Sequence, residues 1–201
     1  MQIEEVLKNL SVHKPYFKSE KEFQLTLSNQ IEKVGLITGV NSSYLGQKVD
    51  ILVKDPNKND ISHAIQLRHK TAYLSMHDGS IVLKNHGAQD QARYDFIKDI
   101  KSLENIKKGD KNVKGYAIIL SNDPKYWQHP TKLNSVDEDF LIYEGKLLYG
   151  NLKWSPHASL GTKLKREENI ELSNEYKCIW GSYSSINLKG NNVFRYLVVE
   201  I

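Results

Sequence analysis

The chain of 201 residues contains little cysteine and no long apolar run, and each absence limits what the protein can be. The single cysteine, Cys178, excludes a disulfide within the chain and a cysteine-rich zinc site. No apolar run approaches the roughly 18 residues that a membrane-spanning helix needs, and residues 1–5 lack a secretory signal pattern. We therefore expect a cytoplasmic protein of a reducing compartment, with no membrane partner.

An excess of charge of one sign is also absent. Lysine and arginine number 28 against 24 aspartates and glutamates, which leaves a net charge of +4. This balance permits a polyanionic partner without requiring one. Hydrophobic residues make up 39% and charged residues 26%, which is typical of a folded chain. The length, with no internal repeat and no linker, predicts a single domain over residues 1–201.

Helical and strand patterns alternate along residues 1–125, which predicts an α/β core. Ser19 and Glu22 form a capping-box pattern at the start of the second helix. In chain order we expect helices within 1–18 and over 19–34, hairpin strands at 48–53 and 63–71, a short strand at 81–83, a helix over 87–103, a charged loop over 104–112 and a buried strand at 113–120.

From Tyr126 onward the pattern changes to short β-rich runs separated by glycine, asparagine and serine turns. The runs cover 140–143, 146–149, 171–172, 178–180 and 194–201. We expect them to form an antiparallel extension over 126–201 that packs on the core, because no linker precedes them.

Polar side chains interrupt the hairpin at its centre. Asp50 lies in the first strand, and Gln66 and Arg68 are two residues apart on the second. Both therefore leave by the same face, as does Lys70, while Leu67 and His69 leave by the other. A carboxylate, an amide and a cation are unfavourable to bury together, which indicates a site rather than a core. The alternative is that Asp50 caps the turn or forms a structural ion pair with Arg68.

Several segments of the chain carry a resemblance to a known family. They are 19–24, 49–51, 64–71, 88–96, 115–118, 121–124, 161–162, 180–184 and 194–197. In this order the chain resembles the PD-(D/E)XK (restriction-endonuclease-like) nuclease superfamily, and within it a widespread bacterial family. The resemblance covers nearly the whole chain. It implies a central mixed β-sheet flanked by helices, with the antiparallel extension at the C-terminal end.

The resemblance also implies a site for Mg²⁺ or Mn²⁺ at the hairpin. By position Asp50 is the metal carboxylate, Gln66 occupies the second ligand position, and Arg68 stands where the superfamily has lysine. Glu20 supplies a further carboxylate, with Glu22 as its rival for that role. In such nucleases the cation polarises the scissile phosphate and activates a water molecule, and the lysine steadies the developing charge.

Two positions depart from the family's Glu-Leu-Lys pattern. The amide oxygen of Gln66 is still a metal ligand, but the site loses a negative charge. Arg68 cannot exchange a proton near neutral pH, although it can hold a phosphate through two N–H groups. Both changes weaken the expected affinity for Mg²⁺ and preserve affinity for phosphate. Lys70 lies on the same face, and we expect it to take over part of the role of the lysine that Arg68 replaces.

The first turns of the predicted helix 87–103 are rich in polar side chains. Gln89, Gln91, Arg93 and Tyr94 resemble the glutamine–tyrosine helix motif that some of these nucleases place against the substrate, which implies contacts to phosphate. The alternative is a solvated first turn.

Taken together, these features favour a metal-dependent nuclease that hydrolyses phosphodiester bonds, with DNA favoured over RNA as partner. A homodimer would suit the cutting of two strands. The first alternative is a catalytically inactive nuclease-like protein that binds nucleic acid or a protein partner. The second is an interaction module with no role at nucleic acid, which the modest net charge leaves open.

Overall fold

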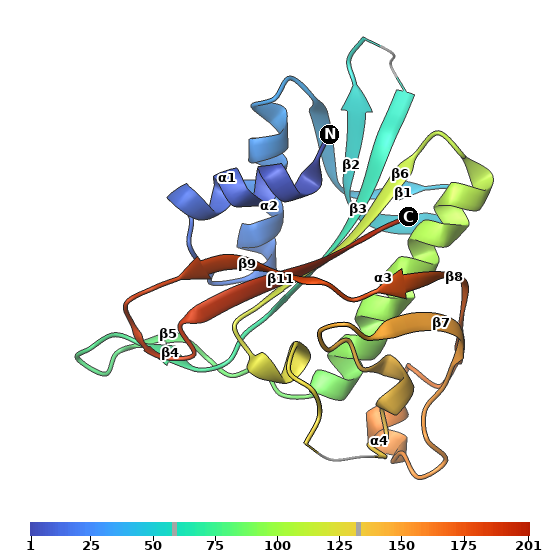
Figure 1. The fold of residues 1–201 in the computed structure, drawn as a ribbon. Coiled ribbons are helices and arrows are strands. Elements are labelled where there is room, and N and C mark those ends of the chain that lie inside the picture. The colour runs from blue at the N-terminus through green and yellow to red at the C-terminus, as the bar shows by residue number, and fades with distance from the viewer. Residues whose placement is uncertain (58–59, 132–133) are drawn as a thin grey trace.

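A six-stranded mixed sheet runs through the molecule, as the computed structural model shows for residues 1–57, 60–131 and 134–201 (Figure 1). Its order is β1-β2-β3-β6-β11-β9. The bounds are β1 Ile37–Tyr44, β2 Gln47–Asp55, β3 Asp60–Lys70, β6 Lys114–Ser121, β9 Trp180–Ser185 and β11 Val193–Glu200. Neighbouring strands are antiparallel except β3 and β6, which are parallel. The expected α/β architecture with a mixed central sheet is confirmed.

Helices cover both faces of this sheet (Figure 1). Helices α1 (Ile3–His13) and α2 (Glu20–Glu32) pack on one face and α3 (Gln89–Gly109) on the other. Strand β3 alternates between the two cores, with Ile65 and Leu67 facing α1 and α2 and Ala64 facing α3. Because β3 and β6 are parallel, the chain between them must cross over the sheet, and α3 forms the main part of that crossover.

The predicted loop over 104–112 is wrong, because α3 continues to Gly109. Glu104 is 2% exposed, and its carboxylate accepts the backbone N–H groups of Ser173 and Asn174. Ile106 is also buried. The charges that suggested a loop are instead helix residues held by tertiary contacts, or lysines of the last turn, which the helix dipole favours.

The C-terminal part divides between two places. Strands β7 (Leu147–Leu152) and β8 (Ile170–Lys177) pair with each other, and β8 lies against α3. Strands β9 and β11 join the central sheet beside β6, so the strands expected in the extension are antiparallel but do not all lie outside the core. The strand predicted at 140–143 is wrong: the 3₁₀ turn η2 (Glu138–Phe140) precedes an irregular segment.

The remaining elements are short. They are β4 (Leu74–Ser75), β5 (Ile81–Leu83), η1 (Pro124–Tyr126), α4 (Leu160–Lys163) and β10 (Lys189–Gly190). Strands β4, β5 and β10 form a small sheet of their own, and the predicted strand at 81–83 is confirmed. Across the described ranges, no helix combines the length and apolar character needed to span a bilayer.

Candidate active site

Strands β2 and β3 part next to Asp50. Their pairing ends where Ile51 lies opposite Ile65. Beyond this point β2 continues against β1, and β3 continues against β6. The parting removes the strand partner from the free edge of β3, whose backbone N–H groups then need other acceptors.

Two carboxylates supply those acceptors. An oxygen of Asp50 accepts the N–H of Leu67 at 2.7 Å, and an oxygen of Glu20 accepts the N–H of His69 at 2.8 Å. The two amides are two residues apart, so they are separated by roughly 7 Å along the strand. Neither carboxylate uses its second oxygen in a hydrogen bond with the described residues. The structure therefore brings Asp50 and Glu20 to one strand edge.

Gln66 crosses the gap between the parted strands. Its amide N–H₂ donates to the backbone carbonyl of Lys48 at 2.6 Å, and the residue is only 7% exposed. Because Lys48 lies two residues before Asp50, the side-chain amide of Gln66 lies beside β2, the strand that carries the Asp50 carboxylate. The amide oxygen of Gln66 is then the group left for a ligand.

Glu20 rather than Glu22 faces this gap because of how α2 begins. Ser19 is the N-cap and accepts the N–H of Glu22 at 3.1 Å, as the capping box predicts. The reciprocal bond differs from the prediction, because the carboxylate of Glu22 accepts the N–H of Lys18 and forms an ion pair with Lys14 at 2.5 Å. Glu22 is thereby held away, and Glu20 is left to reach β3.

The electrostatic state of Asp50 favours a cationic partner. Burial raises the pKa of the Asp50 carboxyl, the Leu67 N–H and Arg68 oppose that rise, and the like charge of Glu20 adds to it. A cation placed beside Asp50 would stabilise its ionised form. The Leu67 N–H and Arg68 therefore offset only part of the free-energy cost of ionising Asp50.

The donor set is limited but suits a hard cation. Asp50, Glu20 and Gln66 offer oxygen atoms, and Mg²⁺ typically keeps several waters and binds through one or two carboxylates. In the described portion of the chain, no three or more His, Cys, Asp or Glu side chains gather as a metal-binding group. The residues thus fit a cation that retains part of its water shell, and not a fully protein-ligated one.

Arg68 is paired with Asp99 of α3, not with Asp50 as the structural alternative predicted. Its Nε and Nη2 donate to the two carboxylate oxygens of Asp99 at 2.6 and 2.7 Å. Burial alone would lower the pKa of Arg68, but its pairing with Asp99 raises it above the ordinary value. Burial raises the pKa of Asp99 above its ordinary value, and the guanidinium of Arg68 opposes that rise. Both carboxylate oxygens accept hydrogen bonds from a permanent cation, which favours the ionised pair.

Sequence reasoning missed Asp99, although a signal was present. Asp99 follows Phe96 by three residues and precedes Leu103 by four, so it lies on the apolar stripe of α3. An ionisable residue inside such a stripe needs a partner. The partner is Arg68, 31 residues earlier, and no local pattern connects the two.

A cleft of about 600 Å³ opens between β3, α3 and the segment that leads into β8. Gln66 and Arg68 line it, and three lysines join them from β2 and α3: Lys48, Lys98 and Lys101. Three acids, Asp99, Glu168 and Glu171, also line the cleft. The lysines were not predicted as site residues. Lys70 is half-buried and follows Arg68 on the same side of β3.

The four polar residues predicted to contact substrate are dispersed. Tyr94 alone of the four is found among the described residues that line the cleft. Gln89 donates to Asp123, Gln91 to the carbonyls of Gly161 and Thr162, Arg93 to Asp137 and the carbonyl of Lys125, and Tyr94 to the carbonyl of Glu168. Each of the four side chains donates a hydrogen bond to another part of the chain. They form neither a solvated first turn nor a row of unbonded groups on one face.

Comparison of the chain with models of protein families, with curated proteins and with solved structures found no match. The geometry described above is therefore the basis for any functional conclusion.

Proposed function

We propose that this protein is a metal-dependent nuclease that hydrolyses phosphodiester bonds of DNA and has a restriction-endonuclease-like arrangement of its core. One observation carries the proposal. The carboxylates of Asp50 and Glu20 accept the N–H groups of Leu67 and His69, two residues apart on the edge of β3, where β2 and β3 part beside a cleft that four cationic side chains line. Carboxylates beside cations suit a phosphate substrate, because the carboxylates can hold a metal ion and the cations can bind the phosphate backbone of DNA.

Each residue has a role in this proposal. Asp50 and the amide oxygen of Gln66 would hold Mg²⁺ or Mn²⁺, with Glu20 next to them along the strand. The cation would supply Lewis-acid polarisation of the phosphate and a bound water of lowered pKa. Arg68 uses two of its nitrogens on Asp99, so its Nη1 is directed by that pair and can donate to a phosphate oxygen.

The test is a cleavage assay on plasmid and single-stranded DNA with Mg²⁺ or Mn²⁺, comparing wild type with Asp50→Asn. Asparagine keeps an oxygen that can accept the Leu67 N–H, but it removes the negative charge and replaces the second oxygen with an NH₂ group. We expect a loss of at least about 100-fold in rate, as for other groups that stabilise transition-state charge. Asp55→Asn, the same change at the far end of β2, is the matched control and should cut as wild type does.

A second candidate is a nuclease-like protein that binds nucleic acid without cutting it. The pairing of Arg68 with Asp99 favours this reading, because an arginine held by two bonds cannot move a proton and has little freedom to follow a reaction. The double variant Gln66→Glu with Arg68→Lys distinguishes the two. Cleavage by this variant alone would support the second candidate, whereas silence of wild type and double variant, with no binding, would contradict both.

A further inference from the structure

A third side chain follows Asp50 and Glu20 along the free edge of β3. The Nδ1 of His86 accepts the backbone N–H of Thr71, the residue after β3, at 3.2 Å. This amide lies two residues beyond the one that Glu20 accepts and four beyond the one that Asp50 accepts. The three N–H groups therefore leave the strand by one edge at intervals of roughly 7 Å. The proposed metal site is one end of a row of three side chains.

His86 is fixed against Thr71 by more than this one bond. Its backbone N–H donates to the carbonyl of Thr71 at 2.7 Å, and the Thr71 hydroxyl donates to the carbonyl of Lys84 at 2.7 Å. Thr71 is buried. The segment that leads from β5 to α3 is thus bonded to the end of β3 at three points, which restricts the position of the imidazole.

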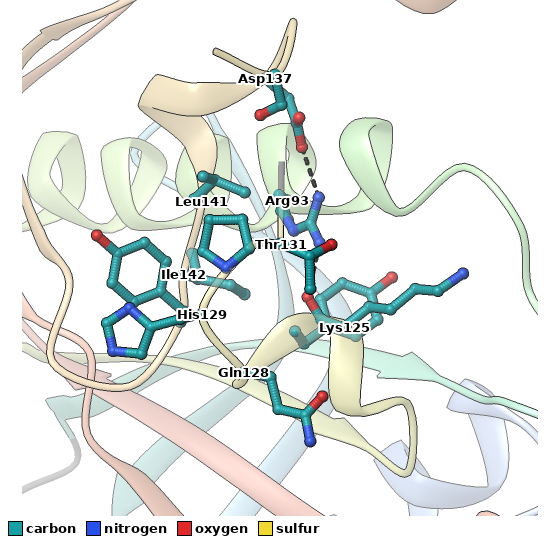
Figure 2. Close-up of a pocket in the computed structure, with 12 residues that line it drawn as sticks. Arg93, Lys125, Gln128, His129, Thr131, Asp137, Leu141 and Ile142 are labelled. Atoms are coloured by element: carbon teal, nitrogen blue, oxygen red, sulfur yellow. Dashed lines mark hydrogen bonds and ion pairs between the residues drawn. The ribbon is translucent and has the colours of Figure 1, made fainter. Parts of the chain in front are cut away.

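The chain that follows His86 is fixed as well, because the first turns of α3 are bonded to other parts of the chain. Gln89 donates to the carboxylate of Asp123 at 2.9 Å, and Arg93 donates to that of Asp137 at 2.5 Å. Figure 2 shows the pair of Arg93 and Asp137 at the wall of a cavity of about 270 Å³. His86 therefore lies between two anchored segments, and a ligand that it contacts would not have to order it first.

The hydrogen bonds decide which ring nitrogen of His86 carries the proton. A backbone N–H can only donate, so the Nδ1 that accepts it is unprotonated. The Thr71 hydroxyl lies 3.3 Å from the same nitrogen, but its hydrogen is used on the carbonyl of Lys84. The neutral ring therefore carries its proton on Nε2, in a residue that is exposed overall. Partial burial of the imidazole lowers the pKa of His86 most, Lys70 lowers it further, and Glu20 opposes the fall.

A nucleic acid strand that follows this edge would change partners along the way. At Asp50 and Glu20 it would meet carboxylates, which repel a phosphate unless a metal ion lies between them. About 7 Å further along it would meet the Nε2–H of His86, with the ammonium of Lys70 close enough to influence the imidazole. An imidazole N–H donates a hydrogen bond to a phosphate oxygen without losing its proton. This end of the row therefore suits a phosphate that the metal does not reach.

We propose that His86 is a substrate-contacting residue, whose Nε2–H donates a hydrogen bond to a phosphate oxygen next to the scissile phosphate. It binds and aligns the strand and takes no part in proton transfer. The inference deepens the proposed nuclease function and rests on it for the identity of the bound strand. The alternative is that His86 only satisfies the N–H of Thr71 at the end of β3.

Two substitutions separate these roles, because each reproduces one ring nitrogen. His86→Asn keeps an oxygen near the position of Nδ1, where it can accept the Thr71 N–H, and removes the Nε2–H. His86→Gln extends an NH₂ donor to the position of Nε2 and loses the acceptor at Nδ1. A contact to phosphate requires the glutamine variant to bind DNA better, whereas a purely structural role requires the asparagine variant to do so.

The measurement is the affinity for short fluorescent single strands by anisotropy, in EDTA at slightly alkaline pH, made in wild type and repeated with Asp50→Asn, which removes one repelling charge. We expect His86→Asn to weaken binding at least about ten-fold, as for a hydrogen bond to a charged group. The loss should be the same for strands of different sequence, because a phosphate contact carries no base information. His86→Gln should retain most of the affinity. His13→Asn, at the exposed end of α1, is the matched control and should bind as wild type does.

Four outcomes would overturn the inference. They are the absence of DNA binding in both backgrounds, wild-type affinity of His86→Asn, weaker binding by His86→Gln than by His86→Asn, and a loss that depends on the base sequence. The nuclease proposal is tested separately, because these affinities need neither metal nor cleavage. Wild-type protein that binds DNA through His86 but cuts none would contradict the nuclease proposal alone, and cleavage that His86→Asn leaves unchanged together with DNA binding would contradict this inference alone.

Discussion

Two arginine–aspartate pairs lie along α3, one buried and one half-buried, and they leave different groups of the arginine without a partner. Arg68 donates from two nitrogens to both oxygens of Asp99. Arg93 gives one nitrogen to Asp137 and another to a backbone carbonyl, and its Nε is left without a partner among the described residues. The bidentate pair fixes a cation at a cleft wall, whereas the other leaves an unused donor next to a cavity. The bonding geometry, not the residue type, therefore decides which nitrogen atoms of each arginine are left without a partner among the described residues.

Removing each aspartate should lower the free energy of unfolding by an amount that depends on how deeply its arginine is buried. The Arg93 side chain is 11% exposed, against 27% for Arg68. Asp137→Ala leaves the charge of Arg93 unpaired at the less exposed position and should reduce the free energy of unfolding by roughly 4 kcal/mol. Asp99→Ala should reduce it by about 2 kcal/mol, because water reaches Arg68. Urea unfolding of both variants measures this. Equal losses, or a larger loss for Asp99→Ala, would contradict the comparison.

The opposite face of β3 provides a third arrangement, a buried ionisable group with no counter-charge. His69 packs against Phe17 and Phe23, as its predicted orientation away from Arg68 required. Neither ring nitrogen has a hydrogen-bond partner in the described residues. Burial, with smaller contributions from His86 and Lys70, lowers the pKa of His69 to about 4.

The lowered pKa of His69 predicts a pH-dependent stability. Its contribution is fully present above the unfolded pKa of about 6.5 and is lost as the pH falls toward about 4, since only the unfolded chain takes up the proton in that window. The loss is about 1.4 kcal/mol per pH unit for this residue. His69→Phe should reduce the slope of unfolding free energy against pH by that amount, while His63, whose pKa burial also lowers to about 4, keeps its own share. A variant with the slope of wild type would contradict this account.

The smallest effect concerns the lysines that line the cleft. Lys98 is exposed and lines the cleft beside Asp99. Lys98→Ala should weaken DNA binding several-fold at low salt and reduce the slope of log affinity against log salt by about 1. Lys33→Ala removes the same charge at the end of α2, on the other face of the sheet, and should change neither. Equal effects of the two substitutions would assign binding to net charge and not to the cleft.

The sequence predicted side-chain orientation and helix capping correctly where a short-range rule sufficed. The two-residue spacing on a strand placed Gln66 and Arg68 on one face and His69 on the other, and the structure confirms both. The N-cap of α2 was visible as Ser19. The parting of β2 and β3 was not visible, because it depends on β3 continuing beside β6, and β2 beside β1, after the pairing of β2 with β3 ends.

Partners from distant elements could not be predicted. Asp99 pairs with Arg68, and Glu104 accepts the N–H of Ser173 in the middle of β8, across 31 and 69 residues of chain. In both cases a charged residue lies on a buried face of α3. Its charge alone predicts an exposed position, but a distant partner compensates the charge and allows burial. Arg93, predicted as a phosphate contact, likewise has a distant partner that its sequence position did not reveal, because it pairs with Asp137.

The most direct test of the central claim is the binding of Mn²⁺ to wild type and to Asp50→Asn, measured by electron paramagnetic resonance and calorimetry without nucleic acid. The account predicts saturable binding by wild type and a loss of at least ten-fold in affinity for Asp50→Asn, with Asp55→Asn binding as wild type does. Equal affinity of wild type and Asp50→Asn, or no saturable binding by wild type, would contradict the assignment of the parted strands as a metal site.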